Sequence, residues 1–174
     1  GFDWSGIEAR MFAAYTGDQE DLDLFAQGPD IHTFTCAKYL MAWAPEALPG
    51  CQSHDLHLPL DWTGGKDERR TKAKNFRYGV LQNGMSARSV LTIPGLEKLG
   101  LDRVLLERRA QNFLNARPRA MAWKSLVWQD CIEQKSARTF MGHRRHLYGD
   151  SDDRKKQGIS HMISGSVSNM MNWC

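Results

Sequence analysis

The sequence alternates between segments of helical periodicity and residues that cap or stop helices, and this pattern limits the fold more than any other feature. Apolar residues recur at three- and four-residue spacing from Ser5 until Gly17. Asp18, Asp30 and Asp102 stand where an N-cap is expected, and Pro118 ends a helix. The expected helices cover about 5–17, 18–28, 30–45, 67–82, 102–117, 119–134 and 154–173.

Strands are expected in only two places. Phe2 and Trp4 flank Asp3 as strand alternation would, and residues 137–147 form two short strands around Gly142. Residues 44–66 contain clustered prolines and glycines, which predict a connecting loop interrupted by the run 54–60. The predicted fold class is therefore α+β and mostly helical.

Composition excludes several classes of protein. A chain of 174 residues, 41% hydrophobic and 25% charged, is typical of one globular domain. Its apolar runs stay well below 18 residues, so no membrane span is expected. The four cysteines are widely spaced, which favours free thiols over a zinc site or disulfides. Because it begins at Gly1 and ends at Cys174, we expect it to be part of a longer protein.

The stretch Lys66–Arg88 is strongly basic although the whole chain carries only +3. It has seven Lys or Arg residues against two acidic ones, a local net charge of +5. On a helix, Arg70, Lys74, Arg77 and Tyr78 share one face. Cations one turn apart followed by an aromatic ring can hold a polyphosphate and a flat base. A solvated basic helix is the alternative interpretation.

Three other side chains could carry chemistry, each with an ordinary alternative. Asp3 follows a predicted strand, where a carboxylate can bind Mg²⁺ or begin a helix. Glu8 is either functional or an exposed helical glutamate. His32 lies in the first turn of a helix, where a partly buried, hydrogen-bonded histidine is common.

Taken together, these segments resemble the polymerase core of the family A DNA polymerases. Asp3–Arg10 (DWSGIEAR) resembles the family's motif A, DYSQIELR, and is followed by Gly17-Asp18 and by DIHT at Asp30–Thr33. Arg70–Gly79 fits motif B, R-x3-K-x3-[FY]-G. Weaker matches follow in the family's order. These are TFMGHRR at 139–145, similar to T-x-x-GRRR, and GISHMISGSVSN at 158–169, similar to FNMPVQGTAAD.

The resemblance implies the palm and fingers portion of a right-hand polymerase, with short palm strands and a long fingers helix. Residues 1–45 would be a palm segment with motif A and the start of the fingers, and 46–100 the fingers with the motif B helix. Residues 101–174 would hold the remaining fingers helices, the hairpin and a palm helix. The chain would stop before motif C, which carries the second catalytic carboxylate.

The resemblance also implies roles for single residues. Asp3 would bind both Mg²⁺ ions of a two-metal mechanism, with the backbone carbonyl of Trp4 as a further ligand. Glu8 would be the steric gate that excludes a ribose 2′-hydroxyl. The residues expected to bind the incoming nucleotide are Arg70 and Lys74 at the triphosphate, His32 at the β-phosphate, and Tyr78 at the sugar and base.

Contacts to DNA are implied for four residues. Arg144 and Arg145 would bind phosphates, a role that is independent of DNA sequence. Ser160 and Ser164 take the places of the family's Asn and Gln, which face the minor groove of the primer-template. The chain also departs from the family at Gly6, which replaces Gln, and at Gln82-Asn83-Gly84, which replaces a Tyr-Gly pair.

The expected function is that of an intracellular DNA-directed DNA polymerase, bacterial, phage-borne or organellar. Its partners would be primer-template DNA, deoxynucleoside triphosphates and the rest of the polymerase chain, and no membrane. Residues 1–174 alone are not expected to incorporate nucleotides. Two alternatives stay open: a polymerase-like module that binds nucleic acid without catalysis, and a single-subunit RNA polymerase, which a gate at Glu8 disfavours.

Overall fold

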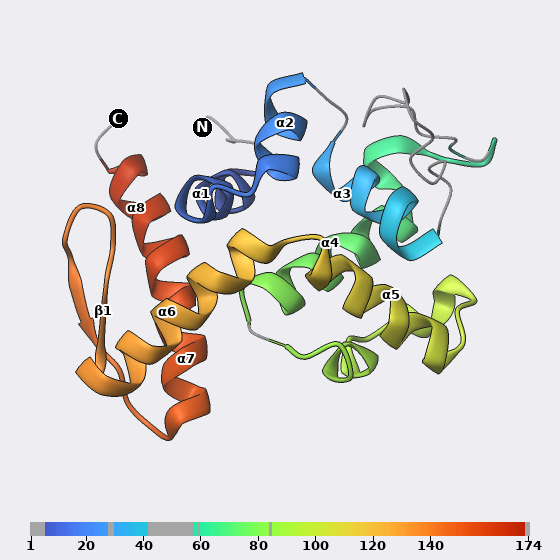
Figure 1. Cartoon of the computed structure of the whole chain (residues 1–174). Helices are drawn as coiled ribbons and strands as arrows, with labels where there is room; N and C mark the ends of the chain where they lie inside the picture. The colour runs from blue at the N-terminus through green and yellow to red at the C-terminus, as the bar shows by residue number, and fades with distance from the viewer. Residues whose placement is uncertain (1–5, 28–29, 42–57, 59, 84, 173–174) are drawn as a thin grey trace. The chain divides into compact units, whose positions relative to one another are not determined.

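The computed structural model describes residues 6–27, 30–41, 58, 60–83 and 85–172. The described chain is mostly helical and has one small two-stranded sheet (Figure 1). It divides into two compact units. Unit 1 comprises 1–22, 82–84 and 118–174, and unit 2 comprises 23–81 and 85–117.

Unit 1 packs helices from both ends of the chain against one another, with a β-hairpin at its edge beside α6 and α7 (Figure 1). Helix α6 contacts α7 and α1, and α1 also contacts α8. The elements are α1 (Ile7–Thr16), α6 (Pro118–Gln134), β1 (Ser136–Arg138), β2 (Arg144–His146), α7 (Ser151–Ser160), the π-helical turn η5 (His161–Gly165) and α8 (Ser166–Met171). Helix α2 (Gln19–Gln27) crosses from unit 1 to unit 2.

The hairpin confirms the prediction of two short strands around Gly142. Strands β1 and β2 are antiparallel, with Ala137 opposite Arg145. The turn between them places Gly142 at φ +84°, a left-handed conformation that glycine adopts without steric cost. The N–H of Gly142 donates to the carbonyl of Thr139 at 2.9 Å, which closes the turn.

The core of unit 1 depends on a close approach between α6 and α7. A Cβ atom at Gly158 would collide with the Sγ atom of Cys131, so only glycine allows this spacing. Trp123 of α6 packs edge-on against Phe12 of α1, with ring centroids 5.7 Å apart. Burial raises the pKa of the Cys131 thiol to about 11, so it packs as a neutral side chain.

Unit 2 contains the basic helix. Helix α4 contacts α3, and the π-helical turn η1 contacts both α4 and α5. The elements are α3 (Ile31–Thr35), η1 (Cys36–Met41), the 3₁₀ turns η2 (Gly64–Lys66), η3 (Ser89–Thr92) and η4 (Leu96–Leu99), α4 (Glu68–Leu81) and α5 (Arg103–Asn115).

Phe113 of α5 lies at the centre of the aromatic core of unit 2. Its ring contacts Tyr39 and Phe76 at centroid distances of 5.0 and 5.1 Å, both edge-on. The buried guanidinium of Arg117 lies 3.9 Å from the centroid of the Phe113 ring and donates to the Phe113 carbonyl at 3.2 Å. Since Phe76 belongs to α4, this aromatic core packs against the buried face of the basic helix.

Most helix boundaries agree with the caps in the sequence. Asp30 accepts a hydrogen bond from the N–H of Thr33, and Asp102 accepts one from the N–H of Leu105. Gly17 ends α1 at φ +61°. The predicted strand at 1–5, and residues 44–57 and 59 of the loop predicted over 44–66, lie outside the described residues.

The prediction for the last helix was wrong at its start. Residues 151–153, which were expected to precede this helix, belong to the first turn of α7, because the Asp150 carboxylate accepts hydrogen bonds from the N–H groups of Asp152 and Asp153, both at 2.9 Å. The helix therefore begins at Ser151, three residues earlier than expected, and the π-helical turn η5 interrupts it.

Candidate functional site

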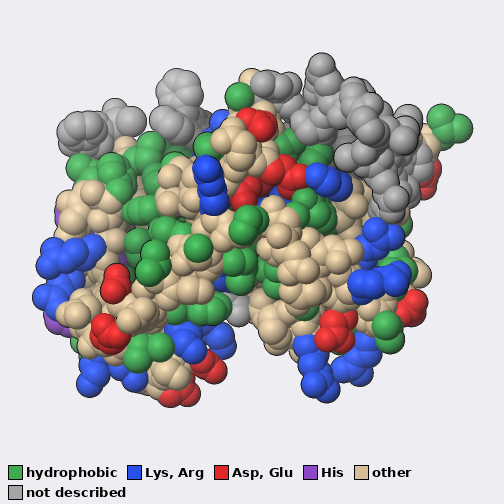
Figure 2. Space-filling model, viewed as in Figure 1, with side chains coloured by type: hydrophobic (Ala, Val, Ile, Leu, Met, Phe, Trp, Pro, Cys, Tyr) green, Lys and Arg blue, Asp and Glu red, His purple; other side chains and the backbone are tan. Residues whose placement is uncertain are grey.

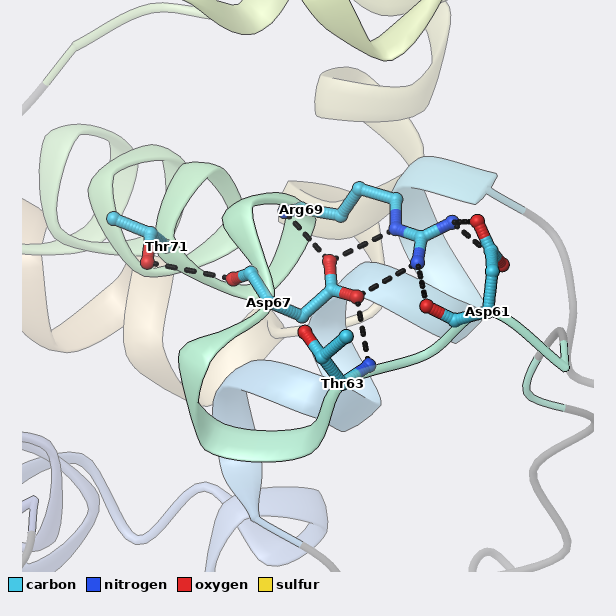
Figure 3. Close-up of polar contacts among 5 residues, drawn as sticks. All are labelled: Asp61, Thr63, Asp67, Arg69 and Thr71. Atoms are coloured by element: carbon cyan, nitrogen blue, oxygen red, sulfur yellow. Dashed lines mark hydrogen bonds and ion pairs between the residues drawn. The ribbon is translucent and has the colours of Figure 1, made fainter.

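The basic helix α4 is anchored at its start by Asp67. This buried carboxylate accepts hydrogen bonds from the N–H groups of Thr63 and Arg69, at 3.1 and 2.9 Å, and from the Arg69 guanidinium at 2.7 and 2.8 Å (Figure 3). Arg69 also reaches both carboxylate oxygens of Asp61 at 3.2 Å. The hydrogen bonds from Arg69 hold the pKa of Asp67 well below its usual range. The network thus fixes where α4 begins and how it is rotated.

Unit 2 brings together the four residues predicted to bind the nucleotide. Arg70, Lys74 and Tyr78 follow one another at one-turn spacing along α4, and His32 comes from α3. The rings of His32 and Tyr78 lie 5.7 Å apart between centroids. The ammonium of Lys74 lies 5.7 Å from the centroid of the Tyr78 ring. The predicted cluster therefore forms between two contacting helices.

Asp30 holds the guanidinium of Arg70 in a two-point ion pair. Arg70 donates from Nε to one carboxylate oxygen at 2.8 Å and from Nη2 to the other at 2.6 Å. The same carboxylate caps α3 through Thr33. Burial raises the pKa of Asp30, but the hydrogen bonds from Arg70 and Thr33 outweigh it and lower the pKa overall. Asp30 therefore stays ionised and orients a cation of the cluster.

Arg77 does not share the exposed face on which helical spacing placed it. Its side chain is only 2% exposed, and its guanidinium lies 5.8 Å from the centroid of the Phe113 ring. A residue three positions from Lys74 can lie on the edge of the same face, and here packing against α5 turns it inward. The exposed cations of the predicted set are thus Arg70, which is partly exposed, and Lys74.

His32 is neutral at physiological pH. It is 4% exposed, and its Nδ1 atom is buried and has no hydrogen-bond partner. Burial, together with the positive charges of Arg77, Arg70 and Lys74, lowers its pKa to about 4, against the opposing effect of Asp30. The ring can therefore serve as a hydrogen-bonding group without adding a charge. The expected partly buried, hydrogen-bonded histidine is more deeply buried than the sequence suggested.

This lowered pKa predicts a loss of stability in mild acid. The unfolded chain binds a proton at His32 near pH 6.5, whereas the folded chain does so only near pH 4. Stability should therefore fall as pH drops through that window, by up to about 3 kcal/mol for this group. Chemical denaturation at several pH values measures the effect. The control is His32→Gln, which should flatten the slope between pH 6.5 and 4; an unchanged slope would contradict the assignment.

In unit 1, Glu8 is linked to a residue far away in the sequence. The hydroxyl of Ser164 in η5 donates to the Oε1 atom of Glu8 at 2.7 Å. Glu8 lies in the first turn of α1 and is partly buried. Two turns further along α1, the Tyr15 hydroxyl is hydrogen-bonded to Ser166 at 2.8 Å. The glutamate is therefore a held side chain, and not the freely exposed one of the alternative interpretation.

Three of the four residues predicted to bind DNA are exposed on unit 1, whereas Ser164 is partly buried beside Glu8. Arg144 and Arg145 are neighbours on β2, and both are exposed. Ser160 is the exposed last residue of α7. On the face drawn in Figure 2, basic side chains form separate groups among acidic and hydrophobic ones, in keeping with the small net charge.

The predicted magnesium ligands Asp3 and Trp4 lie outside the described residues. Within the part of the chain that the structure describes, no three His, Cys, Asp or Glu side chains gather as a metal site would require. No described helix is long and apolar enough to cross a membrane.

Two contacts made by candidate site residues were not predicted from the sequence. Asp30 was recognised as a helix cap but not as the partner of Arg70, 40 positions away. The bond between Glu8 and Ser164 spans 156 positions. Sequence spacing indicates that Asp30 caps a helix and that Glu8 lies near a helix start. It does not indicate which distant residue each carboxylate contacts.

Comparison with known proteins finds homologues of the chain. The chain is 31% identical over 148 residues to the thermostable DNA polymerase I of Thermus thermophilus, a match that covers 83% of this chain and 14% of that protein. The chain is a homologue of the family A DNA polymerases. The corresponding enzyme of Thermus aquaticus is 30% identical, with the same shares of each chain covered. DNA polymerase I of Lactococcus lactis is 24% identical over 97% of this chain.

The fold agrees with this relationship. The polymerase domain of Pol1 from M. smegmatis, solved with a DNA primer-template and dNTP, superimposes with a TM-score of 0.69 at 17% identity, over 97% of this chain and 27% of that chain. No family model matches the sequence. This polymerase I homologue spans about a seventh of the length of its curated relatives, since the matches cover 14% of them.

Proposed function

We propose that residues 1–174 are the palm and fingers portion of a DNA-directed DNA polymerase, and that they bind the incoming deoxynucleoside triphosphate opposite a DNA template. One observation supports this above the others, namely the meeting of His32, Arg70, Lys74 and Tyr78 between α3 and α4. Two cations and an aromatic ring at one-turn spacing on a helix are suited to bind a ligand in which a polyphosphate is joined to a flat base. The site also carries a neutral imidazole.

In this proposal, each side chain has a role that follows from its surroundings. Lys74 supplies a mobile point charge, whereas Arg70 supplies a planar guanidinium that Asp30 already orients. Neutral His32 offers a hydrogen bond to a phosphate oxygen without repelling the nearby cations. Tyr78 presents its ring to the sugar and base. Together these groups position the triphosphate and stabilise charge as the phosphoryl group is transferred.

The proposal extends to the rest of the site. Asp3 and the carbonyl of Trp4 stay the proposed ligands of Mg²⁺, which supplies Lewis-acid activation of the phosphoryl group when bound. Glu8 is the proposed steric gate against ribonucleotides. Arg144, Arg145 and Ser160 are the proposed contacts to the DNA, as is Ser164 in addition to its bond to Glu8. Primer-template DNA, deoxynucleotides and the remainder of a polymerase chain are the proposed partners, and the proposed location is inside the cell.

Primer extension by the complete protein tests the proposal. Wild-type protein should extend a DNA primer with deoxynucleotides and largely reject ribonucleotides. Glu8→Ala should keep deoxynucleotide incorporation but raise ribonucleotide incorporation, because the space for a 2′-hydroxyl opens. The measured quantity is the ratio of kcat/KM for the two nucleotides, expected to fall about tenfold or more.

The outcomes separate the competing functions. DNA binding without incorporation of any nucleotide would favour a non-catalytic polymerase-like module. A wild-type preference for ribonucleotides would favour a single-subunit RNA polymerase. Deoxynucleotide preference that is unchanged by Glu8→Ala would leave the polymerase in place and rule out the gate.

A further inference from the structure

The carboxylate of Glu8 is attached by one short hydrogen bond to a segment of unit 1 that lies 156 positions further along the chain. Ser164 donates to Glu8 at 2.7 Å in a partly buried position. A hydroxyl bound to an ionised carboxylate at this distance forms a charge-assisted bond, which is stronger than one between neutral groups. Glutamate has three side-chain dihedral angles, so without this bond the carboxylate would sample several rotamers.

The segment that carries Ser164 is itself held in place. The next residue, Gly165, is so closely packed that a Cβ atom there would approach Thr139 to 2.9 Å. Ser166 is fully buried, and its hydroxyl accepts a hydrogen bond from the N–H of Phe140 at 3.1 Å and is bonded to Tyr15. Two hydrogen bonds, one accepted by Glu8 from Ser164 and one between Tyr15 and Ser166, therefore join α1 to the junction of η5 and α8. The segment that carries Ser164 is therefore fixed by the close packing of Gly165 and by the hydrogen bonds of Ser166.

We propose that Ser164 is a positioning residue that fixes the Glu8 carboxylate and thereby sets the discrimination between deoxyribonucleotides and ribonucleotides. This inference rests on the proposed function, in which Glu8 excludes the 2′-hydroxyl. A steric gate excludes a small group only while it stays in place, because a rotamer change would move the carboxylate by more than the size of a hydroxyl. Ser164 contributes by restricting that movement, without touching the nucleotide.

The test measures sugar discrimination in the complete protein. Ser164→Ala should lower the ratio of kcat/KM for deoxynucleotides over ribonucleotides about tenfold, equivalent to about 1.4 kcal/mol. The change should come from a higher kcat/KM for ribonucleotides. Because Ser164 is also a proposed contact to the DNA, loss of that contact should affect both nucleotides alike and leave their ratio unaltered. Ser164→Thr keeps the hydroxyl and should retain wild-type discrimination. Ser168→Ala is the matched control, since Ser168 is an exposed serine on the neighbouring α8.

A double-mutant cycle separates positioning from a general structural effect. In a Glu8→Ala background, Ser164→Ala should have no further effect on discrimination, because the gate is already absent. If Ser164→Ala does not fold, Ser164→Cys removes the strong donor at nearly the same volume and should give the same loss. Unchanged discrimination in both variants, or an equal loss in the Glu8→Ala background, would overturn the inference while leaving polymerase activity intact. A wild-type protein that incorporates no nucleotide would instead overturn the proposed function and the inference with it.

Discussion

Lys74→Ala in the complete protein is expected to lower kcat/KM for deoxynucleotide incorporation by roughly 10²–10³-fold. Lys74 is exposed on α4, one turn from both Arg70 and Tyr78. Its ammonium would face the triphosphate, where negative charge is redistributed as the leaving group departs. Removing one preorganised positive charge from such a site typically has an effect of this size. Single-turnover primer extension at varied nucleotide concentrations measures it.

Two controls make this result specific. Lys72→Ala removes a cation from the same helix, but Lys72 is paired with Glu68 at 2.8 Å, so incorporation should change little. Lys74→Arg keeps the charge and should recover part of the activity. Since Lys74 is exposed, its replacement should alter stability by no more than about 0.5 kcal/mol. Equal losses for Lys72→Ala and Lys74→Ala would argue for general electrostatic attraction and against a triphosphate site.

Phe113→Ala is expected to destabilise unit 2 by about 3–5 kcal/mol. The ring contacts Tyr39, Phe76 and the guanidinium of Arg117, and it is fully buried. Its removal would leave a cavity between α4, α5 and η1 and would deprive the buried Arg117 of the nearer of the two rings that it contacts, the other being Tyr39. Native-state hydrogen exchange should show the protection of α4 and α5 amides falling by roughly 100-fold or more, since 1.4 kcal/mol is a factor of ten.

The matched control lies on the same helix. Val104 is 77% exposed, so Val104→Ala should change amide protection by less than about threefold, corresponding to about 0.5 kcal/mol. A loss of protection confined to α5 after Phe113→Ala would contradict the role of this ring in supporting α4. The link matters for the proposed function because Phe76 shares helix α4 with Arg70, Lys74 and Tyr78, which are predicted to bind the nucleotide.

Local features of the structure could be predicted because their causes are local. The carboxylates of Asp30 and Asp102 bond to N–H groups three residues away, and Gly17 ends α1 by its own backbone conformation. The basic helix was placed within one residue of its observed limits, Glu68–Leu81. The hairpin around Gly142 was likewise predicted, since its turn depends on a single glycine. Hydrogen bonds between residues a few positions apart can be predicted because both partners lie in the same short stretch of sequence.

The candidate site was predicted only in part. Helical spacing predicted that Arg70, Lys74 and Tyr78 share one face of a helix. The resemblance to the polymerase motifs predicted that His32 joins them. Spacing also placed Arg77 on that face, yet it is buried beside Phe113. The difference between an exposed and a buried cation at the edge of a helix face depends on which neighbour packs there, and α5 is distant in sequence.

The sequence by itself determined most of the helix limits, the hairpin and the relationship to family A polymerases, because caps, periodicity and motifs are properties of short segments. Only the tertiary structure decided which charged side chains form ion pairs and which are fixed by hydrogen bonds to distant residues. Asp30 orients Arg70 across 40 positions, Ser164 anchors Glu8 across 156, and the burial of His32 among cations makes it neutral. These properties depend on distances through space and on desolvation, both of which arise when remote segments pack together.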